Sequence, residues 1–297
     1  MPNNNIITGK RIEYSFNAYS FINGYILLQI HRMHLYVNIF NYSKGYYFIF
    51  NGCIELKEIQ ITKDVFISDL YCVYLKDISA VVISDLHLGF EEEMNLHGLF
   101  LPKLQRNHIE NMVDNILDTY SPDKLIINGD FKQEFSRNLP QEWDDVNHFI
   151  DRYKKETELI FVRGNHDNYL MTILKSNKMD MYDYYETDNY YIYHGDRDRS
   201  LKKLTILGHE HPSIVLRDEI GSVFKIPAFV FNNDYRVLIT PAMSFFSSGT
   251  DVSESLLSDE HFTPVLKNVS NKFRAYGITE DFGLLDFGYI TDISQHV

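Results

Sequence analysis

Five short apolar runs in this chain each end in residues that can bind a metal ion or move a proton. The clearest is the segment LIFVRGNHDNYL, in which an apolar run stops at Gly164 and three polar side chains follow. Each polar group alone is typical of an ordinary turn, but together they indicate a site. In chain order the groups are Asp85-Leu86-His87, Gly129-Asp130, Gly164-Asn165-His166-Asp167, His194-Gly195 and Gly208-His209-Glu210-His211.

The residue types in these groups favour one kind of metal chemistry. Carboxylates, imidazoles and an amide oxygen without a thiolate suit divalent Mn, with Fe or Zn as alternatives. The ligands are too many for one tetrahedral ion and fit two ions that share a carboxylate. Two such ions lower the pKa of a bound water and stabilise the attacking and leaving oxygens in phosphoester hydrolysis.

Alternating strands and helices are predicted to position these groups. Apolar runs predict strands at 80–84, 124–128 and 158–162. Helical spacing predicts helices at 103–119 and from Trp143 to Tyr153. This alternation is typical of a largely parallel sheet, whose ligands bind at the carboxyl edge of the strands. A second, mixed or antiparallel sheet facing the first is predicted from runs at 190–194, 204–208, 228–232, 236–240 and 283–287.

Composition limits the class of protein. The 297 residues carry a formal charge of −13, and an acidic chain is repelled by a nucleic-acid backbone. This argues against a simple DNA-binding module, but not against a nuclease whose metals supply positive charge locally. Two cysteines give no disulfide framework, and no membrane span or secretory signal is visible, so a cytoplasmic location without a membrane partner is expected.

Residues 1–75 differ from the rest of the chain, since they are rich in Tyr, Phe, Ile and Asn. They predict a β-rich N-terminal segment in which no chemistry is visible. Residues 76–297 contain all five polar groups and are predicted to form one catalytic domain.

The motifs SDLHLG, NGD, GNHD, HG and GHEH resemble those of the calcineurin-like metallophosphoesterase superfamily. Longer stretches, such as PDKLIINGDFKQEF and LITPAMSFFSSGTDV, resemble archaeal phosphoesterases related to the SbcD nuclease subunit, over about residues 65–290. The resemblance implies an α/β fold of two facing mixed β-sheets flanked by helices, an αββα sandwich.

The resemblance also implies a role for each matching residue. It gives the first metal the ligands Asp85, His87, Asp130 and His211. It gives the second metal the ligands Asn165, His194 and His209, with Asp130 as the bridge. His166 is then a general acid or transition-state stabiliser, because an imidazole titrates near neutrality and can protonate a leaving alkoxide. Asp167 orients either His166 or a neighbouring ligand.

Two positions depart from the pattern of that branch. Its members often have a histidine where Gln133 stands, and many have His-Gly-His where this chain has His194-Gly195-Asp196. Glu91, Glu92 and Glu93 are expected to be a solvated helix start. A phosphate-attracting rim, or alternatively a solvated charged loop, is expected from Arg197, Arg199, Lys202 and Lys203.

The predicted function is therefore a two-metal phosphoesterase that hydrolyses phosphodiester bonds, with DNA as the substrate of an SbcD-related nuclease. One alternative is a phosphatase or a small cyclic nucleotide phosphodiesterase. The charge of −13 favours such a small substrate over long DNA. A further alternative is a metal-binding scaffold without activity, against which the complete ligand set and His166 argue. A protein partner is not indicated by any segment of the sequence.

Overall fold

A sheet of seven strands carries three of the five polar groups. The computed structural model describes residues 36–42, 45–51, 57–217, 223–247, 249–252, 263–269, 272–280 and 282–293. The strand order is β3-β4-β5-β6-β7-β8-β9, antiparallel from β3 to β6 and parallel from β6 to β9. The strands are β3 (Glu58–Thr62), β4 (Val65–Ser68), β5 (Cys72–Leu75), β6 (Ala80–Ile83), β7 (Lys124–Asn128), β8 (Glu158–Val162) and β9 (Met181–Tyr182).

The N-terminal segment predicted for residues 1–75 falls largely outside the described residues. Its described part includes the antiparallel pair β1 (Tyr36–Tyr42) and β2 (Gly45–Asn51). It also includes β3, β4 and β5, which extend the first sheet from β6. The strands just before residue 75 therefore belong to the sheet that leads to Asp85, and a separate segment stays a prediction for the residues before Glu58.

The second sheet carries the remaining two polar groups. Its strands β11, β12 and β15 are parallel, whereas β14 pairs antiparallel with β13, β15 and β17, so the sheet is mixed as predicted. The strands are β10 (Tyr185–Glu186), β11 (Tyr190–Ile192), β12 (Leu204–Leu207), β13 (Pro212–Arg217), β14 (Val223–Asn232), β15 (Val237–Ile239), β16 (Thr250–Asp251), β17 (Arg274–Thr279) and β18 (Gly283–Tyr289).

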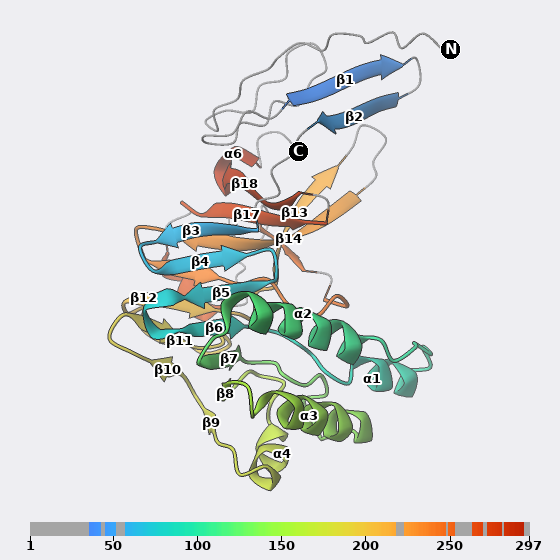
Figure 1. The fold of residues 1–297 in the computed structure, drawn as a ribbon, viewed down its shortest axis with the longest axis vertical. Helices are drawn as coiled ribbons and strands as arrows, with labels where there is room; N and C mark the ends of the chain where they lie inside the picture. The colour runs from blue at the N-terminus through green and yellow to red at the C-terminus, as the bar shows by residue number, and fades with distance from the viewer. Residues whose placement is uncertain are drawn as a thin grey trace.

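The larger helices pack on one face of the first sheet (Figure 1). They are α1 (Phe90–Leu96), α2 (Gln105–Tyr120), α3 (Pro140–Tyr153) and α4 (Leu170–Ser176). The helices predicted at 103–119 and up to Tyr153 are thus confirmed. Short helical segments η1 (Lys76–Ile78), η2 (Pro264–Asn268) and α6 (Ile290–Ile293) complete the described helices, and η2 and α6 cover the outer face of the second sheet.

Alternating side chains in the strands explain the layers. In β6, Val81 and Ile83 pack against the helices, whereas Ala80 and Val82 pack against the second sheet. Because successive residues of a strand point to opposite faces, a run that is apolar throughout predicts a sheet covered on both sides. The structure therefore confirms the predicted fold class of two facing sheets with flanking helices.

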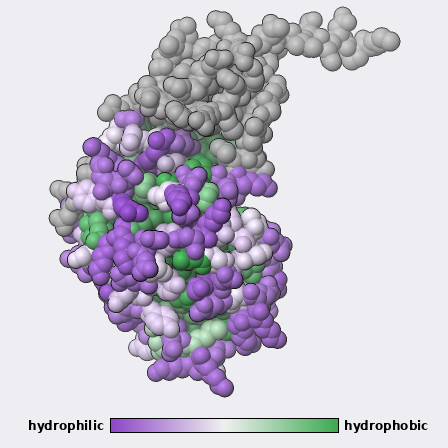
Figure 2. Space-filling view, turned by 60° about the vertical axis from the view of Figure 1, so that its left-hand side comes forward, coloured by the Kyte–Doolittle hydropathy of each residue, from purple (hydrophilic) through white to green (hydrophobic). Residues whose placement is uncertain are grey.

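The described surface can be followed on one face of the molecule. The face drawn in Figure 2 is mostly hydrophilic, and its apolar areas are small and separate. Among the described residues, every helix is too short or too polar to cross a bilayer.

Replacement of Ile126 tests the sandwich core. Ile126 is fully buried in β7 and faces the second sheet. Because Ile126→Ala removes buried methyl groups and leaves a cavity, we expect it to lower the free energy of unfolding by about 2–5 kcal/mol in urea titrations. Leu99→Ala is the control, since Leu99 is 54% exposed. Equal losses in the two variants would contradict this packing.

Candidate metal centre

The five polar groups meet where strands of both sheets end. Asp85 and His87 follow β6, Asp130 follows β7, and Asn165 follows β8. From the second sheet, His194 follows β11, and His209 and His211 follow β12. Parallel strands place their carboxyl ends at one edge, so residues far apart in the sequence converge.

The first cluster joins the two sheets. Asp85, His87, Asp130 and His211 each offer a ligand atom, and these atoms all lie within 4.8 Å of one another. His211 Nε2 lies 2.9 Å from Asp85 Oδ1, and 3.4 Å from His87 Nε2. Two imidazole nitrogens and two carboxylates therefore face a common point.

The second cluster shares Asp130 with the first. Ligand atoms of Asp130, His194 and His209 lie within 4.8 Å of one another. His194 Nε2 lies 3.2 Å from Asp130 Oδ2 and 3.2 Å from Asn165 Oδ1. The structure thus brings together all seven predicted ligands, with Asp130 between the two groups.

The chemistry of this donor set fits two divalent cations. Asp85 and Asp130 are both buried, and two carboxylates so close together need positive charge to be stable in a low-dielectric site. Among the described residues, the buried His87 Nδ1 has no hydrogen-bond partner, and His87 Nε2 faces another imidazole nitrogen. Carboxylate, imidazole and amide ligands without a thiolate suit metals of intermediate hardness.

Hydrogen bonds on the outer side of the rings orient the imidazoles. His194 Nδ1 donates to the carbonyl oxygen of Asn128 at 3.0 Å, which leaves Nε2 directed at Asp130. His211 Nδ1 is held by Ser247 Oγ at 2.8 Å. Such partners fix the ring and raise the basicity of a ligand nitrogen. Neither Asn128 nor Ser247 was predicted, because partners outside the ligand shell follow no spacing rule.

The backbone at the site is unusual. Asp85, His87, Asp130, His209 and His211 all have positive φ, between 45° and 67°. Residues other than glycine rarely adopt a positive φ. Each such residue lowers the free energy of unfolding by an amount on the order of 1–3 kcal/mol. Five strained residues in one site indicate that the backbone is bent so that neighbouring side chains converge.

Two glycines leave room for the carboxylates. A Cβ at Gly164 would lie 2.2 Å from Asp130 Oδ1, and a Cβ at Gly208 would lie 2.7 Å from Asp85 Oδ2. Both distances are shorter than any real contact, so only glycine fits there. The glycine that opens the GNHD motif is therefore required by the position of Asp130, which follows the neighbouring strand β7.

Burial and neighbouring charges separate the pKa values of the site histidines. Burial lowers the pKa of His87 to about 4. Burial also acts to lower the pKa of His194, but the adjacent Asp130 and Asp85 carboxylates outweigh it and raise that pKa to about 10. The pKa of His211 is likewise raised, since Asp85 outweighs the effect of burial. For Asp130, burial is outweighed by His194 and His87, which lower the pKa of the carboxyl group.

His166 lies at the edge of both clusters. Its backbone N–H donates to Asp130 Oδ1 at 2.9 Å, and its Nε2 lies 4.0 Å from Asp130 Oδ2. The side chain is 25% exposed. On the far side of the ring, Nδ1 donates to the carbonyl oxygen of Gln133. Gln133, where members of the SbcD-related branch often have a histidine, therefore contacts His166 through its main chain.

Asp167 is fully buried and bonds to the backbone of two ligand loops. Its Oδ2 accepts from the N–H of Gly164 at 2.9 Å, and its Oδ1 accepts from the N–H of Phe131 at 3.0 Å. Burial, followed by the charge of Asp130, raises the pKa of Asp167 to about 6. These two hydrogen bonds join the loop that carries Asp130 to the loop that carries Asn165.

The predicted basic rim is compensated by acidic side chains. Arg197 lies 3.5 Å from Asp183 and 3.6 Å from Asp196, and Lys203 lies 3.1 Å from Glu186. Arg199 also lies 3.7 Å from Asp183, and Lys202 lies 3.9 Å from Glu186. This pairing fits the charged-loop alternative better than a rim of free cations.

Glu91 differs from the expectation of a solvated helix start. It is fully buried, and its Oε1 accepts N–H bonds from Leu104 at 2.9 Å and Gln105 at 2.8 Å. A carboxylate from α1 therefore satisfies the first amides of α2. The sequence gives no sign of this, because Glu91 is brought to the start of α2 by the packing of the two helices.

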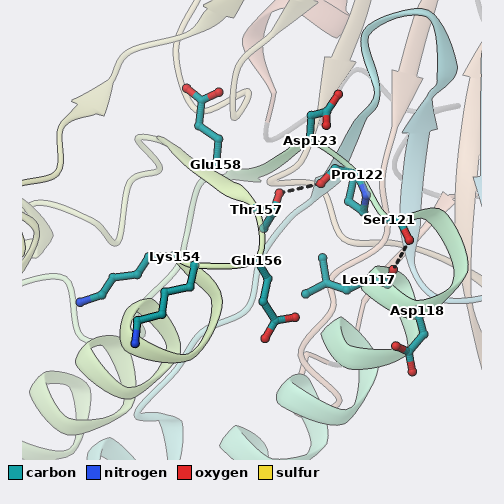
Figure 3. Close-up of a pocket in the computed structure, with 10 residues that line it drawn as sticks. Leu117, Asp118, Ser121, Pro122, Asp123, Lys154, Glu156, Thr157 and Glu158 are labelled. Carbon is teal, nitrogen blue, oxygen red and sulfur yellow. Dashed lines mark hydrogen bonds between the residues drawn. The ribbon is translucent and has the colours of Figure 1, made fainter.

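A separate pocket of about 620 Å³ lies at the opposite, amino-terminal ends of β7 and β8 (Figure 3). Acidic and basic side chains both line it, among them Asp118, Asp123, Lys154 and Glu156. None of the seven clustered ligands lines this pocket, so the chemistry belongs to the carboxyl edge.

Residues 78–242 match the family model of calcineurin-like phosphoesterases, which is more than half of the chain. The chain therefore belongs to the calcineurin-like phosphoesterase family. It is a metal-dependent hydrolase that acts on phosphoester bonds, and its Asp and His clusters suit a dinuclear metal site.

A solved structure has a similar fold. The crystal structure of the nuclease MPE from Pseudomonas putida matches with a TM-score of 0.56 and 21% sequence identity. The match covers 74% of this chain and 95% of that chain. At this identity the likeness shows a shared fold. No curated protein matches the chain.

Replacement of Gly164 tests the close approach of the GNHD loop to Asp130. Gly164→Ala places a Cβ where Asp130 Oδ1 lies, so we expect metal content to fall below one ion per chain by elemental analysis. Gly98→Ala is the control for general backbone strain, since Gly98 has a positive φ of 84° but a Cβ there meets no atom within 4 Å. Full metal content in Gly164→Ala would contradict the crowding.

Calorimetry tests the charge state of the histidines. A cation binds the neutral ring, so His194, with its pKa of about 10, must lose a proton when the cation binds at pH 7. His87 is already neutral there, because its pKa is about 4. We expect Mn²⁺ binding to release at least one proton at pH 7 and to tighten as pH rises. The measurement is titration in buffers of different ionisation enthalpy, and binding without proton release would contradict the raised pKa.

Proposed function

We propose that this chain is an SbcD-related phosphodiesterase that cleaves DNA with two divalent cations, Mn²⁺ being the best fit to the ligands. The observation that carries the proposal is the position of Asp130. Its carboxylate belongs to both ligand clusters, and His166 lies beside it. A diester bond between the cations and this imidazole would meet every group that its hydrolysis requires.

The proposed roles follow the two clusters. Asp85, His87, Asp130 and His211 would hold one cation. Asp130, His194 and His209 would hold the other, and Asn165 would join them through its amide oxygen. The bound cations would supply positive charge for the phosphoryl oxygens and an activated water.

The residues around the cations would move and hold protons. Since His166 donates at Nδ1 to the Gln133 carbonyl, its Nε2 is the atom that faces Asp130 and the proposed phosphate position. A protonated Nε2 can give its proton to the leaving alkoxide, which is otherwise a poor leaving group. Asp167 keeps the loops of Asp130 and Asn165 in register through its backbone hydrogen bonds.

The similar solved structure is that of a nuclease, which supports a nucleic acid such as DNA as the substrate, whereas the charges favour a second candidate. The cations after His194 are paired with acidic groups, and the net charge is −13. Long DNA would gain little from counterion release on such a surface. This observation favours a short or cyclic nucleotide as the alternative substrate.

The cytoplasm is the proposed location, where a free buried thiol such as Cys72 stays reduced.

Hydrolysis assays with added Mn²⁺ test the proposal. We expect wild type to cleave bis-p-nitrophenyl phosphate faster than p-nitrophenyl phosphate, and to degrade single- or double-stranded DNA. His166→Ala removes the proton donor but no metal ligand. We therefore expect DNA turnover to fall by about 10²–10⁴-fold at unchanged metal content.

The other outcomes each contradict part of the proposal. Diester cleavage without DNA cleavage would indicate the small nucleotide substrate. A preference for the monoester would indicate a phosphatase. No turnover by a chain that contains two metals would indicate a scaffold, and loss of metal in His166→Ala would remove the assigned role of His166.

A further inference from the structure

A buried lysine and a buried glutamate lie beneath the loop that follows Asp130. The side chains of Lys132 and Glu142 are fully buried, and Lys132 Nζ lies 3.6 Å from Glu142 Oε1. Lys132 stands two residues after Asp130, whereas Glu142 lies in the first turn of α3. Burial of two charges is unfavourable unless further hydrogen bonds satisfy both groups. The partners of this pair therefore show what it organises.

Those partners are all in residues 133–139, here called the 133–139 loop. Glu142 Oε1 accepts from the N–H of Glu134 at 2.6 Å, and Oε2 accepts from the N–H of Leu139 at 2.7 Å. Lys132 Nζ donates to the carbonyl oxygens of Arg137, at 3.0 Å, and of Glu134. The pair thus binds the loop near its start, its middle and its end.

The 133–139 loop in turn contacts the proposed acid. The carbonyl oxygen of Gln133 accepts from His166 Nδ1, which fixes the tautomer and directs Nε2 at the metal centre. From the same loop, the Phe135 ring lies edge-on to the His166 ring, with 6.3 Å between the centroids. If the loop moved, His166 would lose the partner that sets its orientation.

Glu142 also packs against the loop that carries two ligands of the first cluster. A Cβ at Gly89 would lie 2.5 Å from Glu142 Cγ, so the backbone there rests directly on the glutamate. Gly89 is two residues after His87, and the neighbouring Leu88 pairs with Lys132 through a β-bridge. Glu142 therefore lies where both loops meet.

We propose that Glu142, together with Lys132, is a positioning residue for the hydrolytic reaction. It holds the 133–139 loop so that the Gln133 carbonyl keeps His166 oriented toward the leaving group. This inference rests on the function proposed above. Both side chains are fully buried and bond to the 133–139 loop, so both act through His166.

Dependence on the leaving group separates this role from a general loss of structure. The substrates are esters of thymidine 5′-phosphate with 4-nitrophenol, phenol and methanol, assayed with Mn²⁺. The 4-nitrophenolate leaves without a proton, whereas methoxide needs one. We expect His166→Ala to reduce kcat for the methyl ester by about 100-fold or more, and for the nitrophenyl ester by far less.

Glu142→Gln and Glu142→Ala are expected to show the same pattern in weaker form. Loss of a residue that orients a catalytic group typically costs about 10–100-fold, so we expect such a loss in kcat for the methyl ester. The nitrophenyl ester should change by less than about threefold, since its leaving group needs no proton. Glutamine keeps one acceptor oxygen, so Glu142→Gln should lie between wild type and Glu142→Ala. KM and metal content should stay near the wild-type values.

Two further variants control for folding. Lys132→Met combined with Glu142→Leu makes the site apolar, keeps it filled, and avoids an unpaired buried charge. We expect it to fold and to show the same selective loss. Asp114→Asn removes an exposed pair between α2 and α3, in which Asp114 lies 2.6 Å from Arg152. It should leave the ratio between the esters unchanged.

A double-mutant cycle completes the test. If Glu142 acts through His166, then Glu142→Gln should cost nothing further in a His166→Ala background. Equal losses for all three esters, additive losses in the cycle, or loss of metal in Glu142→Gln would each overturn the inference. Failure of wild type to hydrolyse any diester would instead overturn the proposed function.

Discussion

The carboxylate of Asp130 is the constraint on which the rest of the site depends. It belongs to both ligand clusters, accepts the backbone N–H of His166, and lies 3.2 Å from His194 Nε2. A buried carboxylate with so many partners must be reached from several strands at once. This explains why ligands arrive from both sheets, and why β7 lies in the middle of the parallel part of the first sheet.

The convergence of the site side chains on one point strains the backbone. Five of the clustered residues adopt positive φ. At Gly164 and Gly208, a side chain would overlap the carboxylates of Asp130 and Asp85. The strain is sustained because the strands behind it are fixed, with β6 and β7 covered by helices on one face and by the second sheet on the other. A rigid sandwich core thus holds short loops in conformations that they would not adopt alone.

The sequence predicted the elements and ligands that follow local rules. The apolar runs of β6, β7 and β8 indicate strands covered on both faces, and a polar group at the end of each run places its residues at the carboxyl edge. The six residues of the two clusters, and Asn165 beside His194, all lie in the motifs read from the sequence. Helix α2 was found from its spacing, although its first residue depends on the distant Glu91.

What the sequence could not predict depends on contacts between distant segments. Nothing near Glu142 in the chain indicates that it is buried against Gly89 and paired with Lys132. Likewise, β3 to β5 look like a separate segment in the sequence, and only pairing with β6 shows that they extend the first sheet. The partners of Arg197 and Lys203 come from residues 183 and 186, which no spacing rule connects to them.

Electron paramagnetic resonance of the protein titrated with Mn²⁺ tests the shared carboxylate most directly. If Asp130 belongs to both cation sites, the spectrum at two Mn²⁺ per chain should show an exchange-coupled pair, because one carboxylate would bridge the ions. Asp130→Asn should abolish the coupling. A spectrum of independent Mn²⁺ ions in wild type, or saturation at one ion per chain, would contradict the arrangement described for Asp130.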